Sequence, residues 1–572
     1  MPFRLTSDDI LKYMRQPFPC QSVEPDENYD EADVIIAGSG PVGMTFARTI
    51  LENNQDVKVL MLDIGSQDSA VIGEHHKNSI KYQKDIDAFV NVIKGALQPV
   101  SVPPADTYIP TLLGNGWTPP LGNNGQSTLI FHGSNPSQIR EKNLKASAVT
   151  RTVGGMATHW TCACPTPHDE ELKTNPIPDL ERQTLYEQAR KLLNVHNDQY
   201  DKNDNGDDIS IRHNVVKNTL LKELPKRNVQ SIPLAVERRR DNPNYVTWSG
   251  ANTVLGDLAR FKGRFRLRDE MRVTRLSSDP ECATEVGGVC LRNLKTNSDV
   301  FARARAYVIT CGAVGTPSVA AVRNLGVQLP ALGHYLCEQS LAFCQIVMKQ
   351  EMIDRISNND EWKTRIEEHM GRHPQDPLPI PFADNEPQVM IPYTSDTPWH
   401  CQIHRDAFSY GDVGPRADSR VVVDLRFFGK QEIQKKNRVI FFGPEKSPLS
   451  WKAGVKDTYG MPQATFEVER SQQDRINDQR MMKDMCDVAN ILGAYLPGSY
   501  PQFMEPGLAL HITGTTRIGE DDQTSVANPS SQVHGINNLW VGGNGCIPDT
   551  MGSNPTLTSV SISSFLPACC LH

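Results

Sequence analysis

The chain has 572 residues, more than one ordinary hydrophobic core can absorb, so we expect at least two packed regions. Its net charge of -8 argues against a nucleic-acid partner, because such proteins usually carry a basic surface. It contains no apolar run of roughly eighteen residues or more, so the sequence predicts no membrane span and no membrane partner. The first residues are charged and lack an apolar signal core. We therefore expect a protein that is cytoplasmic or is exported by a route that needs no such core.

The first informative segment is a glycine-rich turn between an apolar run of strand type and a segment with helical apolar spacing. Gly38, Gly40 and Gly43 stand in the pattern Gly-x-Gly-x-x-Gly, and a second buried-strand pattern ends at Asp63. The acid follows the last glycine by about twenty residues, which is the spacing of a dinucleotide-binding unit. Such glycines let the backbone and the helix N-terminus approach a pyrophosphate. Asp63 is placed to bind ribose hydroxyls.

Residues 73–140 differ in character from this segment. They are rich in Pro, Gly, Asn and Ser, with one short helical candidate at 84–97. This composition predicts an inserted arm or lid, since long loops of this kind do not form a core. Several apolar side chains would be partly exposed in a monomer, which indicates self-association. They are Ile93, Leu97, Val100, Ile109 and Leu112.

Two later segments return to the pattern of the N-terminal unit. Residues 306–310 form a buried-strand pattern before a glycine-containing turn and a helix, and 538–544 form a short strand that ends in glycines. The first and last parts of the chain are therefore predicted to build one domain. Between them, residues 341–500 combine strand candidates, among them 421–429 and 437–443, with a helical segment at 472–496. This combination suits a substrate domain built on a sheet.

The stretch GGMATHWTCACP places His159 beside Cys162 and Cys164. The histidine could be a metal ligand, a core residue, or a group with a less common role. A zinc site needs four suitably spaced ligands, and no further set of histidines and cysteines completes one. We therefore predict no metal site, while the stretch alone leaves the role of His159 open.

Three motifs together resemble the glucose–methanol–choline (GMC) family of flavin oxidoreductases: the N-terminal glycine pattern, TCGAVGTP at 310–317 and GSNPTLT at 552–558. Further stretches resemble the members of that family that oxidise pyranose sugars, so the resemblance extends over nearly the whole chain. They are THWTCA at 158–163, KNSIKYQKDIDAFVNVIKGAL at 77–97, DAFSYGD at 406–412 and PGLALHITGTTRIG at 506–519.

The resemblance implies an FAD cofactor that is covalently attached through His159, with Thr161 near the flavin N5 atom. It also implies that His511 and Asn554 are the catalytic pair. Residue chemistry agrees, because alcohol oxidation by hydride transfer needs a base for the hydroxyl proton and a second group that holds the oxygen. Asn554 further suits the N-cap of a helix that begins at the following proline.

The same resemblance implies further contacts. On the cofactor side these are Asn544, Pro555 and Thr556. The sugar would be bound by a mobile loop and by two residues for which an ordinary surface position is an open alternative. The loop residues are Asp406, Phe408 and Tyr410, and the other two are Gln402 and Arg426. Ala509 departs from the family pattern, where valine is more usual, and the smaller side chain would widen the pocket near the sugar.

By this resemblance the enzyme would oxidise an aldopyranose at C2 to the 2-keto sugar, pass the electrons to O2, giving H2O2, or to a quinone, and form a homotetramer. Two alternatives stay open. A related carbohydrate oxidoreductase could act at another sugar carbon or on a glycoside. The chain could also be a catalytically silent flavin-binding protein.

The expected fold class is α/β: a Rossmann-like, dinucleotide-binding flavin domain, a sheet-and-helix substrate domain, and an inserted oligomerisation arm. The flavin-binding domain would comprise 31–72, 141–170, 231–340 and 505–572, the arm 73–140, and the substrate-binding domain 171–230 and 341–504.

Overall fold

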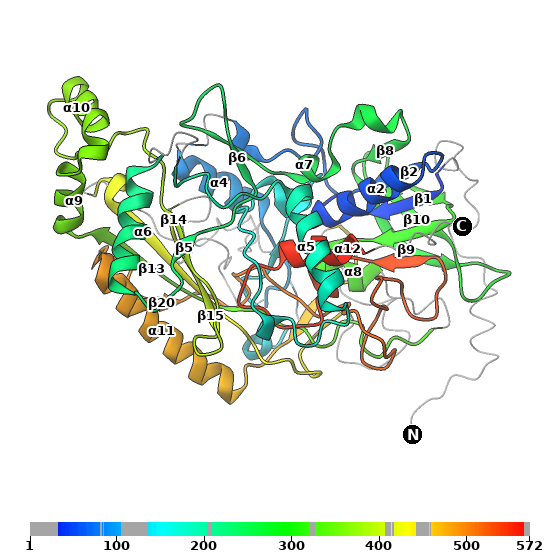
Figure 1. Ribbon diagram of the computed structural model, residues 1–572. Helices are drawn as coiled ribbons and strands as arrows, with labels where there is room; N and C mark the ends of the chain where they lie inside the picture. The colour runs from blue at the N-terminus through cyan, green and yellow to red at the C-terminus, as the bar shows by residue number, and fades with distance from the viewer. Residues whose placement is uncertain are drawn as a thin grey trace, which may run out of the picture.

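The structure is a computed structural model in which the described residues are 32–79, 83, 85–103, 135, 137–202, 209–319, 327–405, 413–414, 417–441, 457 and 459–565. Two sheets of different construction dominate it (Figure 1). A parallel sheet lies at the right of the view and an antiparallel sheet at the left, with helices packed on both. This is the α/β class that the sequence predicts; the domain boundaries given above stay predictions.

The parallel sheet has five strands in the order β21-β12-β1-β2-β8. All its neighbouring strands run parallel, and its central strands are buried along their whole length, which explains their continuous apolar sequences. Strands from the first and the last parts of the chain thus share one sheet, as predicted. The bounds are β1 (Val34–Ala37), β2 (Val59–Leu62), β8 (Phe265–Arg268), β12 (Ala306–Ile309) and β21 (Leu539–Val541).

Helices from distant parts of the chain cover this sheet. Helix α2 begins with a proline at its first position, where the missing N–H costs no hydrogen bond. Helix α5 packs against α12 near the C-terminus, and Tyr186 Oη lies 2.9 Å from Thr558 Oγ1 between them. The bounds are α2 (Pro41–Asn53), α5 (Asp179–Leu193), α7 (Ala251–Leu255), α8 (Gly312–Val319) and α12 (Thr556–Ser563).

Smaller sheets complete this part of the molecule. A three-stranded antiparallel sheet comprises β9 (Met271–Ser278), β10 (Val286–Asn293) and β11 (Ser298–Ala302). Two-stranded pairs are formed by β3 (Gln98–Pro99) with β4 (Ala148–Val149) and by β6 (Val236–Arg238) with β7 (Val246–Trp248).

The second large sheet has seven strands and is antiparallel throughout. Helix α11 (Gln472–Leu492) lies along its outer face, against β13 and β16 (Figure 1). The predicted strand at 421–429 and the predicted long helix are both present. The strands are β5 (Gln230–Ser231), β13 (Ser340–Met348), β14 (Gln388–Ile391), β15 (Trp399–His404), β16 (Val422–Gly429), β19 (Gly493–Tyr495) and β20 (Gln502–Phe503).

One predicted strand of this region lies elsewhere. β17 (Arg438–Ile440) pairs with β18 (Thr465–Glu467) in a separate two-stranded sheet. Three further helices lie beside the large sheet at the left of Figure 1: α6 (Ile211–Glu223), α9 (Gln350–Ser357) and α10 (Lys363–Arg372). Within the described residues, no helix has the length and apolar character needed to cross a membrane.

The described part of the predicted arm contains α4 (Ile86–Ala96), the helix expected from the sequence. Its apolar face is buried within the chain, where it packs with residues that include Phe428 and Leu508. The exposed fractions of Ile93, Leu97 and Val100 are 0 %, 4 % and 7 %. The expectation that these side chains are exposed in a monomer is therefore wrong; the remaining two, Ile109 and Leu112, lie outside the described residues.

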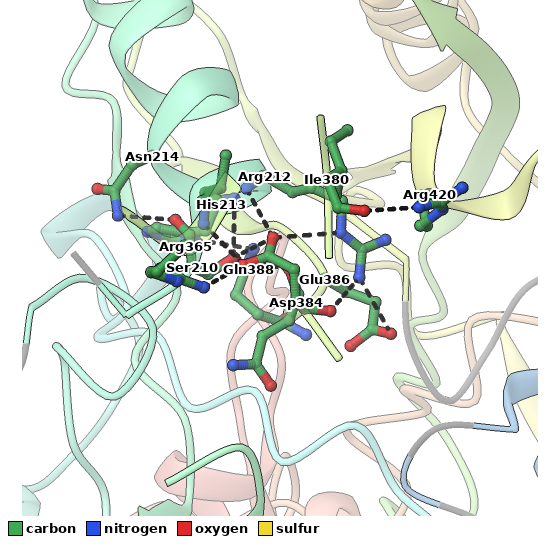
Figure 2. A network of polar contacts seen from close by, with 12 residues as sticks. Ser210, Arg212, His213, Asn214, Arg365, Ile380, Asp384, Glu386, Gln388 and Arg420 are labelled. Carbon is green, nitrogen blue, oxygen red and sulfur yellow. Dashed lines mark hydrogen bonds and ion pairs between the residues drawn. The ribbon is translucent and has the colours of Figure 1, made fainter. Parts of the chain in front are cut away.

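A buried network of charges fixes the start of α6 beside the antiparallel sheet (Figure 2). Figure 2 shows Asp384 at its centre, where the carboxylate accepts hydrogen bonds from the backbone N–H groups of Ile211 and Arg212 at 3.0 and 2.9 Å. Arg365 forms an ion pair with the same carboxylate at 2.9 Å. A carboxylate is favourable here because a helix N-terminus carries partial positive charge.

Candidate active site

A cavity of about 400 Å³ extends from the glycine-rich turn after β1 to the C-terminal segment before α12. Its lining includes Gly38 and Gly40 of that turn, His159, and the pair His511 and Asn554. This volume lies within the range of small-molecule and cofactor sites. The cavity therefore brings the nucleotide motif and the predicted catalytic pair into one site.

The turn after β1 is shaped by close backbone approaches. Gly38 has a φ of +101°, and a Cβ atom there would lie 2.4 Å from the carbonyl oxygen of Thr310. A Cβ atom at Gly43 would lie 2.1 Å from the carbonyl oxygen of Gly38, so this glycine permits the helix to pack on the strand. At Gly40, in contrast, an added Cβ would meet no protein atom within 4 Å. The protein thus leaves no room for a side chain at Gly38 and Gly43, whereas the space beside Gly40 at the helix start is open, which suits a bound pyrophosphate.

Asp63 lines the cavity, but its carboxylate already has protein partners. It accepts hydrogen bonds from Ser39 N at 2.9 Å, Ser39 Oγ at 2.6 Å and Gly65 N at 2.8 Å. Ser39 Oγ in turn accepts a hydrogen bond from Gly154 N at 2.9 Å. Asp63 therefore anchors the glycine turn to the segment that precedes His159, and its contact with a ribose stays a prediction.

His159 follows a short 3₁₀ helix, Gly155–Thr158. The exposed fraction of His159 is only 1 %. Its Nε2 atom lies 2.8 Å from Thr150 Oγ1. Burial lowers the pKa of the imidazole to about 4, so the ring is neutral and retains a nucleophilic lone pair at neutral pH. Thr161 lines the same cavity. Cys162 and Cys164 belong instead to the hydrophobic core.

His511 and Asn554 face one another, with Asn554 Nδ2 positioned to donate a hydrogen bond to His511 Nε2 at 3.2 Å. His511 follows Leu510, a non-glycine residue with a φ of +60°, which marks a constrained turn. Burial, together with a smaller effect of the neighbouring imidazole of His400, lowers the pKa of His511 to about 3. The imidazole is therefore a neutral base.

The predicted role of Asn554 as an N-cap is wrong. Helix α12 begins at Thr556, its N-cap is Pro555, and no side chain caps it. Asn554 precedes this cap by one residue, and its side-chain amide points to His511 instead. Asn544 and Thr556 line the cavity, and Asn544 Oδ1 accepts a hydrogen bond from Ser559 Oγ at 2.5 Å. Pro555 is buried but is absent from the described cavity lining.

Gln402 and Arg426 are partners in the register of β15 and β16, and both line the cavity. Their exposed fractions are 1 % and 2 %, so the alternative of ordinary surface positions is wrong. Gln402 Nε2 donates a hydrogen bond to Asn554 Oδ1 at 2.7 Å. The other predicted sugar contacts, Asp406, Phe408 and Tyr410, lie outside the described residues.

Two buried polar residues directly before β13 were not predicted from the sequence. Gln339 Oε1 accepts a hydrogen bond from His511 Nδ1 at 2.6 Å. Glu338 accepts hydrogen bonds from His511 N at 3.1 Å and from Gln339 N at 2.7 Å, and burial raises its pKa to about 8. No motif marks these positions; two polar residues before an apolar run were the only signal.

Comparisons with a family profile, with related sequences and with solved structures show which proteins this chain resembles. The GMC oxidoreductase family profile matches residues 447–563. A pyranose 2-oxidase of Tricholoma matsutake is 56 % identical over 98 % of this chain and 97 % of its own length. A C-glycoside 3-oxidase of Microbacterium trichothecenolyticum is 30 % identical, over 93 % and 95 %. A formate oxidase from Aspergillus oryzae, solved to examine the effect of a mutation on FAD modification, superposes with a TM-score of 0.61 at 12 % identity, covering 95 % of this chain and 98 % of that one.

Fold, cavity and family together define a GMC-type flavin oxidoreductase with FAD as its cofactor. The open glycine turn at Gly40, the start of α2 and the cavity that continues to His511 fit that cofactor. The chain belongs to the pyranose 2-oxidases within the GMC family. The family resemblance inferred from the sequence is therefore confirmed.

Proposed function

We propose that the protein oxidises an aldopyranose, a glucose-like sugar, at C2 to the 2-keto sugar. One observation carries this proposal: the neutral imidazole of His511 and the carboxamide of Asn554 face one another in the cavity of this protein. The chain is, in addition, similar to a pyranose 2-oxidase. A secondary alcohol loses a hydride from carbon and a proton from oxygen as the carbonyl forms. His511 offers an acceptor for the proton and Asn554 a donor that can hold the oxygen, while the hydride acceptor would be the flavin.

His511 Nε2 would take the proton of the C2 hydroxyl, because the ring is neutral and its Nδ1 atom already forms a hydrogen bond with Gln339. Asn554 Nδ2 would donate a hydrogen bond to the same oxygen. Gln402 and Arg426, in neighbouring strands, would bind other hydroxyls of the sugar. FAD, when bound, supplies the hydride acceptor and passes the electrons on to O2, giving H2O2, or to a quinone.

The cofactor would lie along the cavity with its pyrophosphate at Gly38, Gly40 and the start of α2. Gly43 would act indirectly, by allowing that helix to pack on β1. At the other end Thr161 would lie near the flavin N5 atom. Further contacts would come from Asp63, Asn544, Pro555 and Thr556.

Product analysis tests the site of oxidation. Glucose is incubated with the holoenzyme under oxygen, peroxide is measured, and the product is identified by NMR. We expect the 2-keto sugar and one peroxide for each molecule of product. A 3-keto product, or oxidation of C-glycosides only, would support the alternative that the C-glycoside 3-oxidase relative suggests. If sugars leave the flavin spectrum unchanged, the protein is a silent flavin-binding protein.

We also propose that FAD is attached covalently through His159. Support comes from the buried, neutral imidazole in the cavity wall. Wild-type protein precipitated with acid should keep the yellow colour in the pellet. His159→Ala should bind FAD but release it into the acid supernatant, while His534→Ala, a histidine paired with Ser525, should behave as the wild type. Flavin retained in the His159→Ala pellet would disprove the attachment point.

A homotetrameric assembly is the last part of this proposal and rests on the family relationship. The described part of the arm is buried within its own chain, so it does not supply the apolar surface first expected. Light scattering of the holoenzyme at micromolar concentration should give a mass of about four chains. A monomeric mass would contradict the proposal.

A further inference from the structure

The side-chain amide of Gln339 has only one orientation that satisfies its neighbours. Its Nε2 atom lies 2.9 Å from two backbone carbonyl oxygens, those of Met551 and Ser553. Carbonyl oxygens only accept hydrogen bonds, so the NH2 end of the amide must face them. The oxygen end, Oε1, must therefore face the opposite side.

On that opposite side lies His511, whose Nδ1 atom is 2.6 Å from Gln339 Oε1. An amide oxygen is an acceptor, so the proton of this hydrogen bond belongs to Nδ1. A neutral imidazole carries only one N–H group, which leaves the lone pair on Nε2. Asn554 Nδ2 faces this lone pair at 3.2 Å, and Gln402 holds the oxygen of the same carboxamide at 2.7 Å.

The titratable neighbours do not compete for this role. Glu338 accepts hydrogen bonds from the backbone N–H groups of His511 and Gln339, and burial raises its pKa to about 8. Burial lowers the pKa of His400, a neighbouring imidazole, to about 3. Gln339 is thus an uncharged orienting group, whereas a carboxylate in its place would stabilise the imidazolium and raise the pKa of His511.

We propose that Gln339 is a positioning residue that holds His511 as the Nδ1–H tautomer, so that Nε2 is presented to the substrate as the base. The two backbone carbonyls before α12 fix the amide, and the amide fixes the imidazole. The catalytic meaning of this tautomer rests on the proposed function, whereas the tautomer itself does not.

Stopped-flow reduction of the flavin by glucose tests the catalytic part. Gln339→Leu removes the acceptor, and we expect a loss of reduction rate of roughly ten- to a hundredfold with a smaller change in the apparent sugar affinity. Gln339→Glu keeps an acceptor oxygen and should retain more of the rate, while the acid limb of its pH profile moves to higher pH. Gln345→Leu is the matched control, since this buried glutamine in β13 bonds to Asp424 instead.

Nitrogen-15 NMR of histidine-labelled holoenzyme tests the tautomer without any substrate. The signals of His511 are identified by their loss in His511→Ala. The wild type should show a protonated Nδ1 atom, and Gln339→Leu should show exchange between tautomers or the Nε2–H form. An unchanged pattern in Gln339→Leu, or equal rate losses in the Leu and Glu variants with the same pH profile, would overturn the proposal. Failure to oxidise any sugar would remove the proposed function but leave the NMR result intact.

Discussion

Two buried polar clusters in this molecule are built from different chemistry. The cluster at the start of α6 joins Asp384 to Arg212 and Arg365, so full charges are paired with one another and with a helix N-terminus. The cluster around His511 contains an imidazole and the amides of Gln339 and Asn554. The first cluster holds two segments together. The second keeps a base neutral while it fixes the direction of its lone pair.

The difference follows from what each charge would do. A buried carboxylate must keep its cationic partners, because removal of one partner leaves an uncompensated charge in a medium of low dielectric constant. Near His511 the same carboxylate would raise the pKa of the imidazole and reduce the fraction of free base. Amides orient a neighbour without this effect, which makes them suitable beside a catalytic base. Variants in the two clusters should therefore fail in different ways.

The largest effect is expected at His511. Replacement by alanine removes the proton acceptor, and we expect flavin reduction by glucose to slow by at least about a hundredfold. Stopped-flow absorbance measures this rate directly. His373→Ala, at an exposed position outside the described cavity lining, serves as the control. An unchanged rate in His511→Ala would remove this residue from the mechanism.

The charged cluster should respond in stability instead. Asp384→Asn leaves two arginines facing a neutral group, and we expect the free energy of unfolding to fall by about 3 kcal/mol. Chemical denaturation of the holoenzyme measures the loss, and flavin reduction by the folded fraction should stay at the wild-type rate. Asp487→Asn, which breaks an exposed pair with Lys483, should leave stability unchanged. A loss of rate without a loss of stability would contradict the division between the two clusters.

A smaller effect is expected at Gln402. Gln402→Leu releases Asn554 Oδ1, so the carboxamide is free to rotate away from His511. The loss of one buried hydrogen bond predicts a rate about tenfold lower. Steady-state kinetics with glucose would detect it, with the exposed Gln473→Leu as the control. A change in sugar affinity alone would show that Gln402 binds substrate without orienting Asn554.

The smallest expected change is in the pH dependence of the wild type. Because the pKa of His511 is lowered to about 3, its protonation should not reduce kcat/KM as the pH falls through the ordinary histidine range. The acid limb should therefore lie well below about pH 6.5. Rates measured across the range in which the holoenzyme is folded check this. A limb near the ordinary histidine value would show that the imidazole is protonated more easily than its burial suggests.

Local sequence patterns predicted the flavin-binding part of the fold well. The glycine pattern and its flanking apolar runs correspond to β1, α2 and β2, because each of these elements is buried and its periodicity is unbroken. The edge strand β8 was not predicted. Its sequence, FRLR, alternates charged and apolar residues, and it is only partly buried, so it lacks the continuous apolar run of a central parallel strand.

Sequence patterns predicted only some of the residues of the candidate site. His511, Asn554 and His159 stand in motifs, whereas the amide of Gln339 stands in none. Its contact with His511 depends on how two distant segments pack, and that information is spread over the whole chain. The wrong expectation for the arm has a similar cause. The apolar face of α4 belongs to one buried cluster with Phe428 and Leu508 from other parts of the chain, which composition alone does not reveal.

The two amides that bond to the proposed catalytic pair have a consequence for protein engineering. Gln339 lies directly before β13 and Gln402 lies in β15, both in the antiparallel sheet, while His511 and Asn554 lie in the C-terminal segment. A chimera that takes this sheet from a relative to change sugar preference would also replace Gln339 and Gln402, the amides that bond to His511 and Asn554. Recombination in this family should therefore keep Gln339 and Gln402 with the C-terminal segment they serve, even when every other residue of the sheet is exchanged.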